Sequence, residues 1–122
     1  MKKKIVIIED NHDILELLGF ILENEDYEVL ASLDPEPVKS LEEINPHLIL
    51  LDENLGKSKG HLLCIDIKAN AGTSHLPVIL ISAVNNLPEI AKKCGADNYI
   101  AKPFLIENLL DLVKMHERRQ KL

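Results

Sequence analysis

Four short apolar runs, each closed by polar residues, constrain the fold of this chain more than any other feature. They are residues 5–8, closed by Glu9-Asp10; 47–51, closed by Asp52; 78–81, closed by Ser82; and 99–101, closed by Lys102-Pro103. Short apolar runs between polar residues are typical of strands buried on both faces of a parallel sheet. Because parallel strands end at the same edge, the sequence predicts that these polar residues meet there as the functional site.

Segments with helical spacing separate the runs. A further short strand is expected at residues 27–31, and Asn11 or Asp10 is expected to cap the first helix. Strands that alternate with helices predict a parallel sheet covered on both faces. The apolar positions with helical spacing are Ile14, Leu15, Leu18, Ile21 and Leu22; Val38, Leu41 and Ile44; Leu62, Leu63, Ile65 and Ile67; and Leu105, Leu109, Leu112 and Val113, with a short helix opened by Pro88 before the last group.

Length and composition limit the class of protein. The 122 residues suit one domain, here 1–122, and the 3% aromatic content predicts an aliphatic core. The formal charge of −6 argues against direct nucleic-acid binding. No apolar stretch approaches the ~20 residues that cross a bilayer, so we expect a cytoplasmic protein without membrane attachment. Cys64 and Cys94 form no metal-binding spacing and are expected to be small buried residues.

Three carboxylates form the strongest candidate site. Glu9, Asp10 and Asp52 would lie at one sheet edge, where their mutual repulsion favours a bound cation. Mg²⁺ prefers a few carboxylates, a carbonyl and retained waters, and the backbone carbonyl of Asn54 is well placed to add the neutral oxygen. The simpler alternative is that acids only cap helices and solvate strand ends; acids that end two different buried strands favour the metal site.

The other two strand ends offer a cation and a hydroxyl. Lys102 can pair with a carboxylate or a phosphoryl oxygen, and we expect its bond to Pro103 to be cis. Ser82 can donate to a phosphoryl oxygen, although a serine at a strand end is common. Tyr99 fits a half-buried strand aromatic with an exposed hydroxyl. Glycines in the loop after Asp52, Gly56 and Gly60, are expected where the backbone needs freedom.

In order and spacing, these residues resemble the receiver domains of bacterial two-component response regulators. The resemblance covers nearly the whole chain. Each motif is short, and their order across one domain-length chain is what makes the match specific. The matching residues are Glu9-Asp10, Asp52, Ser82-Ala83, Gly95-Ala96-Asp97-Asn98-Tyr99 and Lys102-Pro103-Phe104.

The resemblance implies a flavodoxin-like (βα)5 fold with strand order 2-1-3-4-5. It implies that Asp52 accepts a phosphoryl group from a histidine kinase or a phosphotransfer protein, with Mg²⁺ at Glu9, Asp10, Asp52 and the Asn54 carbonyl. Lys102 would pair with the phosphoryl group, while Ser82 and Tyr99 would act in the switch. Such a module is not a metabolic enzyme and catalyses only its own phosphoryl transfer and dephosphorylation. Its partners would be the kinase, a downstream target or output domain, and in some cases a second copy.

Two positions and one stretch depart from the family pattern. Gly56 stands where proline is usual, and Ser82 replaces the commoner threonine. The stretch 82–95 is about two residues shorter than usual, which affects the surface that receivers often use for dimerisation or docking.

Two other functions fit the predicted fold. The first is a receiver-like module that binds partners without phosphorylation; the presence of Asp52, Glu9, Asp10 and Lys102 argues against it. The second is a small flavodoxin-like enzyme or nucleotide binder. The sequence Gly56-Lys57-Ser58 lacks the upstream glycine of a phosphate-binding loop, so this function has little support.

Overall fold

A parallel sheet of five strands forms the centre of the computed structural model, which describes residues 2–117. The strand order is β2-β1-β3-β6-β7, so after β2 the chain crosses to the other side of β1 and adds its remaining strands there. This order, with β6 and β7 as the fourth and fifth strands along the chain, confirms the predicted 2-1-3-4-5 arrangement. The strands are β1 (Lys4–Ile8), β2 (Glu28–Ser32), β3 (Leu48–Asp52), β6 (Val78–Ser82) and β7 (Asn98–Ala101).

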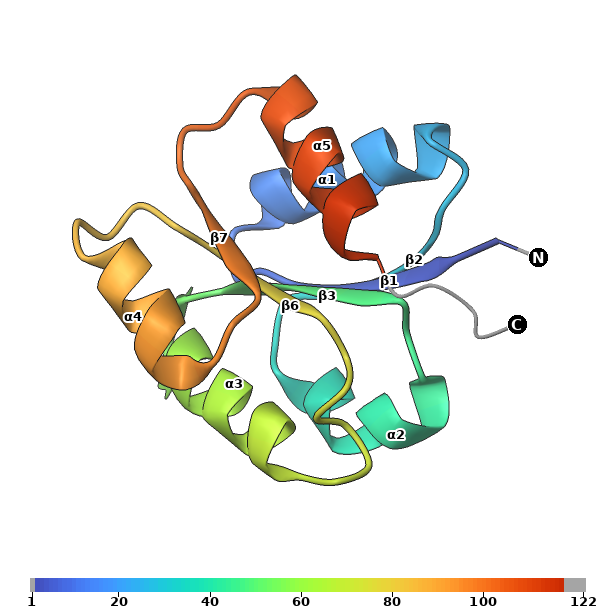
Figure 1. Cartoon of the computed structure of the whole chain (residues 1–122). Coiled ribbons are helices and arrows are strands. Elements are labelled where there is room, and N and C mark those ends of the chain that lie inside the picture. Colours follow the sequence, from blue (N-terminus) through green and yellow to red (C-terminus); the bar gives the residue numbers. More distant parts are fainter. Residues whose placement is uncertain (1, 118–122) are drawn as a thin grey trace.

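Helices cover both faces of the sheet (Figure 1), as predicted. One face carries α1 and α5, and the opposite face carries α2, α3 and α4. The helical elements are α1 (His12–Asn24), the 3-10 helix η1 (Glu36–Ser40), α2 (Leu41–Ile44), α3 (Gly60–Ala69), α4 (Leu87–Cys94) and α5 (Ile106–His116). None of the helices between residues 2 and 117 has the length and apolar character that crossing a bilayer requires.

Alternate residues of the central strands β1, β3 and β6 build two aliphatic cores. In β1, Ile5 and Ile7 pack towards α1 and α5, whereas Val6 and Ile8 pack towards the other three helices. Successive side chains of a strand point to opposite faces, so a strand covered on both sides must be apolar at every position. The apolar runs of the sequence are therefore the strands of the sheet. The prediction that the run 99–101 is buried on both faces is wrong, because β7 is an edge strand that buries Ile100 and exposes Tyr99 and Ala101.

Two helical stripes differ from the sequence prediction. Leu62 and Ile65 of α3 are 54% and 44% exposed, because α3 turns the side that carries Gly60, Cys64 and Ile67 towards the sheet. Leu105 is 66% exposed and precedes the first turn of α5, whose buried residues are Leu109 and Val113. Helical spacing alone fits more than one face when apolar residues are this frequent, and tertiary packing selects the face.

The second helical segment is short and irregular. It begins as η1, which includes Pro37, and continues as the single turn α2. Asn45 adopts a left-handed conformation with φ of 49° and ends the turn directly before Pro46. The predicted weak helix is therefore present, but only as one 3-10 turn and one α turn.

The loop after Asp52 is more ordered than the sequence predicted. It forms a two-stranded antiparallel hairpin of β4 (Asn54–Leu55) and β5 (Ser58–Lys59). Gly56 has a φ of +69° and thus needs the backbone freedom of glycine. Gly60 is required for a different reason: a Cβ atom there would lie 2.1 Å from the carbonyl oxygen of Asp52.

Candidate functional site

The carboxyl ends of the strands bring the predicted polar residues to one edge of the sheet. Ile8 pairs with Leu51, so Glu9 and Asp52 follow neighbouring positions on β1 and β3. Asp52 pairs with Ile81, and the next residue of β6, Ser82, pairs with Ala101 of β7. The backbone amide of Lys102 donates to the Ser82 carbonyl at 2.9 Å, which fixes where the lysine leaves the sheet.

The three acids form a compact cluster. One carboxylate oxygen from each of Glu9, Asp10 and Asp52 lies within 4.8 Å of the other two. Glu9 and Asp52 are 1% and 3% exposed, whereas Asp10 is exposed. The cluster thus has a buried floor and one side open to solvent.

Lys102 supplies the positive charge nearest to these buried acids. Its Nζ lies 2.6 Å from Glu9 Oε1 and 3.6 Å from Asp52 Oδ2. The bond between Lys102 and Pro103 is cis, as predicted from the sequence. The lysine is therefore held mainly by Glu9, which leaves the Asp52 carboxylate only weakly paired.

Burial and charge move the pKa values of the two buried acids in opposite directions. Burial and the adjacent Glu9 carboxylate raise the pKa of Asp52 to about 7, and the attraction of Lys102 offsets only part of this. For Glu9, burial also raises the pKa, but the contacts with Asp52, Lys102 and the Asn11 amide together lower it below the ordinary value. Without a further cation, the raised pKa favours a proton on Asp52 below about pH 7, while Glu9 stays ionised.

The residues present fit a hard divalent cation. Glu9 Oε1 is buried and accepts no well-aligned hydrogen bond, so a lone pair remains available despite the nearby ammonium. Three clustered carboxylates with one side open to water match the ligands that Mg²⁺ prefers. A divalent cation would also remove the repulsion that raises the pKa of Asp52.

Local structure around β1 and β3 orients these acids. Asn11 is the N-cap of α1: its Oδ1 accepts a hydrogen bond from the Ile14 amide at 3.0 Å, while its own amide donates to Glu9 Oε2 at 3.2 Å. The Asn54 amide donates to Asp52 Oδ1 at 3.3 Å. Of the two caps that the sequence allowed, the structure uses Asn11.

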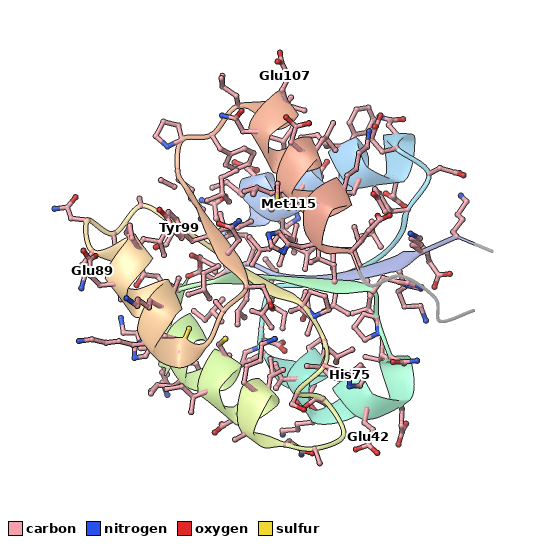
Figure 2. All side chains as sticks on the ribbon, in the orientation of Figure 1. Glu42, His75, Glu89, Tyr99, Glu107 and Met115 are labelled. Atoms are coloured by element: carbon pink, nitrogen blue, oxygen red, sulfur yellow. The ribbon has the colours of Figure 1, made fainter. Side chains whose placement is uncertain are left out.

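The predicted switch residues lie on the two strands beyond Asp52. The Ser82 side chain is buried, and its hydroxyl accepts a hydrogen bond from the Val84 amide at 3.4 Å. Tyr99, labelled in Figure 2, lies on the edge strand β7 and is 38% exposed. The roles of Ser82, Tyr99 and the Asn54 carbonyl remain predictions.

Sequence reasoning missed Glu53 and His61. The Glu53 side chain is only 4% exposed, and its two carboxylate oxygens accept from the His61 amide at 2.7 Å and from the His61 ring Nδ1 at 2.6 Å. A signal was available, because Asp52-Glu53 repeats the acidic doublet of Glu9-Asp10 at a second strand end. The partner of Glu53, eight positions later, could not be identified from the sequence.

Known proteins match this chain over almost all of its length. Residues 5–114 match the family model of the response regulator receiver domain. The DNA-binding dual master transcriptional regulator RpaA of Synechocystis sp. is 31% identical over 119 residues, which are 95% of this chain and 49% of the relative. The chain thus spans about half the length of this relative.

Solved structures of receiver domains have the same fold. The receiver domain of a signal transduction histidine kinase from Syntrophus aciditrophicus is 28% identical, with a TM-score of 0.86 over 98% of this chain and 96% of its own. The receiver domain of a sensor histidine kinase from Pseudomonas aeruginosa is 26% identical, with a TM-score of 0.85 over 95% and 98%; it has a magnesium ion coordinated in its active-site cleft. Together with the acidic edge of the sheet, these matches show that the chain belongs to the response regulator receiver domain family of two-component systems.

Proposed function

We propose that Asp52 is the phosphoacceptor of this receiver domain and that its phosphorylation is the signal the domain transmits. The observation that carries the proposal is the weak pairing of the Asp52 carboxylate within the site. It is buried beside two other carboxylates, while the nearest ammonium lies 1.0 Å closer to Glu9 (2.6 Å) than to Asp52 (3.6 Å). A carboxylate oxygen that is not held in a close ion pair with lysine is available to attack phosphorus.

The acidic cluster would hold Mg²⁺ through Glu9, Asp10, Asp52 and the Asn54 carbonyl. When bound, the ion neutralises charge on the phosphoryl oxygens, which is the main requirement of a loose phosphoryl-transfer transition state. The protein positions the nucleophile: the Asn54 amide donates to Asp52 Oδ1. The other oxygen, Oδ2, faces the Lys102 ammonium.

Transfer from a phosphohistidine would form one bond and break one. An Asp52 carboxylate oxygen bonds to phosphorus as the phosphorus–nitrogen bond of the donor breaks, and the histidine ring takes up a proton. Lys102 then pairs with the new phosphoryl group, and the hydroxyl of Ser82 turns from accepting to donating. This would draw the segment after β6 inward and bias an existing equilibrium of partner binding, with Tyr99 responding on β7.

A histidine kinase or a phosphotransfer protein is the proposed donor, and a downstream protein or output domain the proposed receiver of the signal. The relatives include receiver domains of a transcriptional regulator and of histidine kinases, so similarity does not choose among these outputs. We further propose that residues 1–122 are one domain that acts in the cytoplasm, without direct nucleic-acid contact, as a signalling module rather than a metabolic enzyme. Its only catalysis would be its own phosphorylation and dephosphorylation.

Intact-mass measurement tests the acceptor directly. The protein is incubated with Mg²⁺ and acetyl phosphate, and we expect one added phosphoryl group that is absent from Asp52→Asn and from samples with a chelator. Asp111→Asn, which changes an exposed acid on α5, is the matched control and should be phosphorylated like the wild type. An unmodified wild type would instead support the phosphorylation-independent interaction module.

A further inference from the structure

The N-terminus of α3 has no cap of its own. The residue at the N-cap position is Lys59, whose side chain makes no capping hydrogen bond. Helices usually begin after a serine, threonine, aspartate or asparagine, because a short side-chain oxygen accepts from the free amides of the first turn. A lysine offers no acceptor, so another group has to supply one.

Glu53 supplies the missing acceptor from outside the helix. Its Oε1 accepts from the backbone amide of His61, the second residue of α3, at 2.7 Å. Its Oε2 accepts from the ring Nδ1 of the same residue at 2.6 Å. The carboxylate thus caps the helix and also holds one side chain of its first turn.

The same contacts close the loop that carries the hairpin. The Gly60 amide donates to the Glu53 carbonyl at 2.8 Å, so the main chain and the side chain of Glu53 both bind the start of α3. The intervening residues form the β4–β5 hairpin, and Asn54 is its first residue. The end of the loop is therefore fixed to the residue directly after Asp52.

The start of α3 also lies against the acceptor residue itself. A Cβ atom at Gly60 would lie 2.1 Å from the Asp52 carbonyl oxygen, so the two backbones are in close contact. A shift of the first turn of α3 would thus displace Asp52, Asn54 or both.

We propose that Glu53 and His61 are positioning residues for phosphoryl acceptance, holding Asp52 and the Asn54 carbonyl in place by clamping the start of α3 to the end of β3. This inference rests on the proposed function of Asp52. Glu53 and His61 touch neither phosphorus nor metal in this scheme; they set the geometry of the groups that do. Residues that orient metal ligands in this way typically change metal affinity or activity about 10- to 100-fold when removed.

A second-site substitution separates the clamp from simple helix capping. Glu53→Ala removes both functions, and adding Lys59→Asp restores a capping residue at the ordinary position but not the clamp on His61. We expect Glu53→Ala to lower the thermal unfolding midpoint and the double variant to regain much of it. Mg²⁺ binding by the double variant, measured by calorimetry, should remain at least about tenfold weaker than binding by Lys59→Asp alone.

Two variants serve as controls. Lys59→Asp alone also removes the 3.4 Å contact of Lys59 Nζ with Asn54 Oδ1, so this single variant is the reference against which the double variant is compared. Glu107→Ala removes an exposed first-turn acid from another helix, α5, and should leave Mg²⁺ affinity unchanged (Figure 2). If the Glu53 variants do not fold, His61→Ala keeps the backbone amide that is capped and loses only the ring contact; it should weaken Mg²⁺ binding while the protein stays folded.

Backbone relaxation and amide exchange of residues 54–59, measured without Mg²⁺, provide a readout that does not depend on phosphorylation. The double variant should show a more mobile hairpin than Lys59→Asp alone, because Lys59 itself pairs with Asn54 across the hairpin. If the double variant recovered both stability and Mg²⁺ affinity, Glu53 would act only as a helix cap and the inference would be overturned. A hairpin that stays as rigid as in Lys59→Asp alone would overturn it as well. A wild type that neither binds Mg²⁺ nor accepts a phosphoryl group would contradict the proposed function instead, and the hairpin measurement would still decide the clamp.

Discussion

Removal of the Asp52 charge should stabilise the metal-free protein, and the effect should depend on pH. The folded state raises the pKa of this carboxyl from 3.8 to about 7, because of burial and then of the Glu9 carboxylate. Between these two pH values the folded protein keeps a proton that the unfolded chain has released. The contribution of the Asp52 carboxyl to the free energy of unfolding is therefore largest at low pH and is lost as the pH rises from 3.8 to about 7.

The structure sets the size of the effect. At ~1.4 kcal/mol per pH unit, the interval from 3.8 to about 7 gives an upper bound of about 4 kcal/mol. The partner Glu9 offsets part of this loss of stability. Its folded pKa is lowered, and such a group stabilises the folded state above its ordinary pKa. We expect Asp52→Asn to be more stable than the wild type by about 1 to 3 kcal/mol at pH 8.

Urea unfolding followed by circular dichroism in the presence of a chelator tests this between pH 5 and 8. The advantage of Asp52→Asn should shrink towards pH 5, where the wild-type carboxyl is protonated and resembles the amide. Mg²⁺ should stabilise the wild type more than the variant, since a ligand that binds only the folded state adds stability by mass action. Asp111→Asn should differ from the wild type by less than about 0.5 kcal/mol throughout. If Asp52→Asn were no more stable than the wild type at pH 8, the attraction of Lys102 would outweigh burial and repulsion, and the reasoning would be refuted.

Two further substitutions and one labelling reaction test the structure around the site. Gly60→Ala places a Cβ atom 2.1 Å from the Asp52 carbonyl; chemical unfolding should show a loss of about 1 to 3 kcal/mol, and wild-type stability would contradict the close contact. Asn11→Ala removes the cap of α1 and should cost about 1 kcal/mol by the same assay, whereas no loss would mean that water replaces the cap at no cost. Cys64 and Cys94 are both buried, and burial raises the pKa of the Cys64 thiol, so a thiol-specific reagent should modify them only in denaturant; rapid labelling of the native protein would show that α3 and α4 separate.

Much of the fold follows from local patterns. A run such as Ile5 to Ile8 is apolar at every position, and only a strand covered on both faces buries all four side chains. The helical spacing in residues 14–22 selected the buried side of α1 correctly, because the apolar residues at 14, 15, 18, 21 and 22 form one narrow stripe; Leu17 and Phe20 lie outside it and are exposed. In α3 the same reasoning failed, since apolar residues lie on both sides and the choice depended on how α3 packs on the sheet and α4.

The sequence by itself determined that Glu9, Asp10, Asp52 and Lys102 end or follow strands of one parallel sheet, and hence that they share an edge. The alternation of side chains along a strand repeats every two residues, so neighbouring positions in the sequence are enough to recognise it. Only the tertiary structure decided the pairing within that edge. It placed Lys102 closer to Glu9 than to Asp52, and it joined Glu53 to His61 at the start of α3. These choices depend on differences of about an ångström in the distances between segments that the whole fold brings together, and no local pattern encodes such differences.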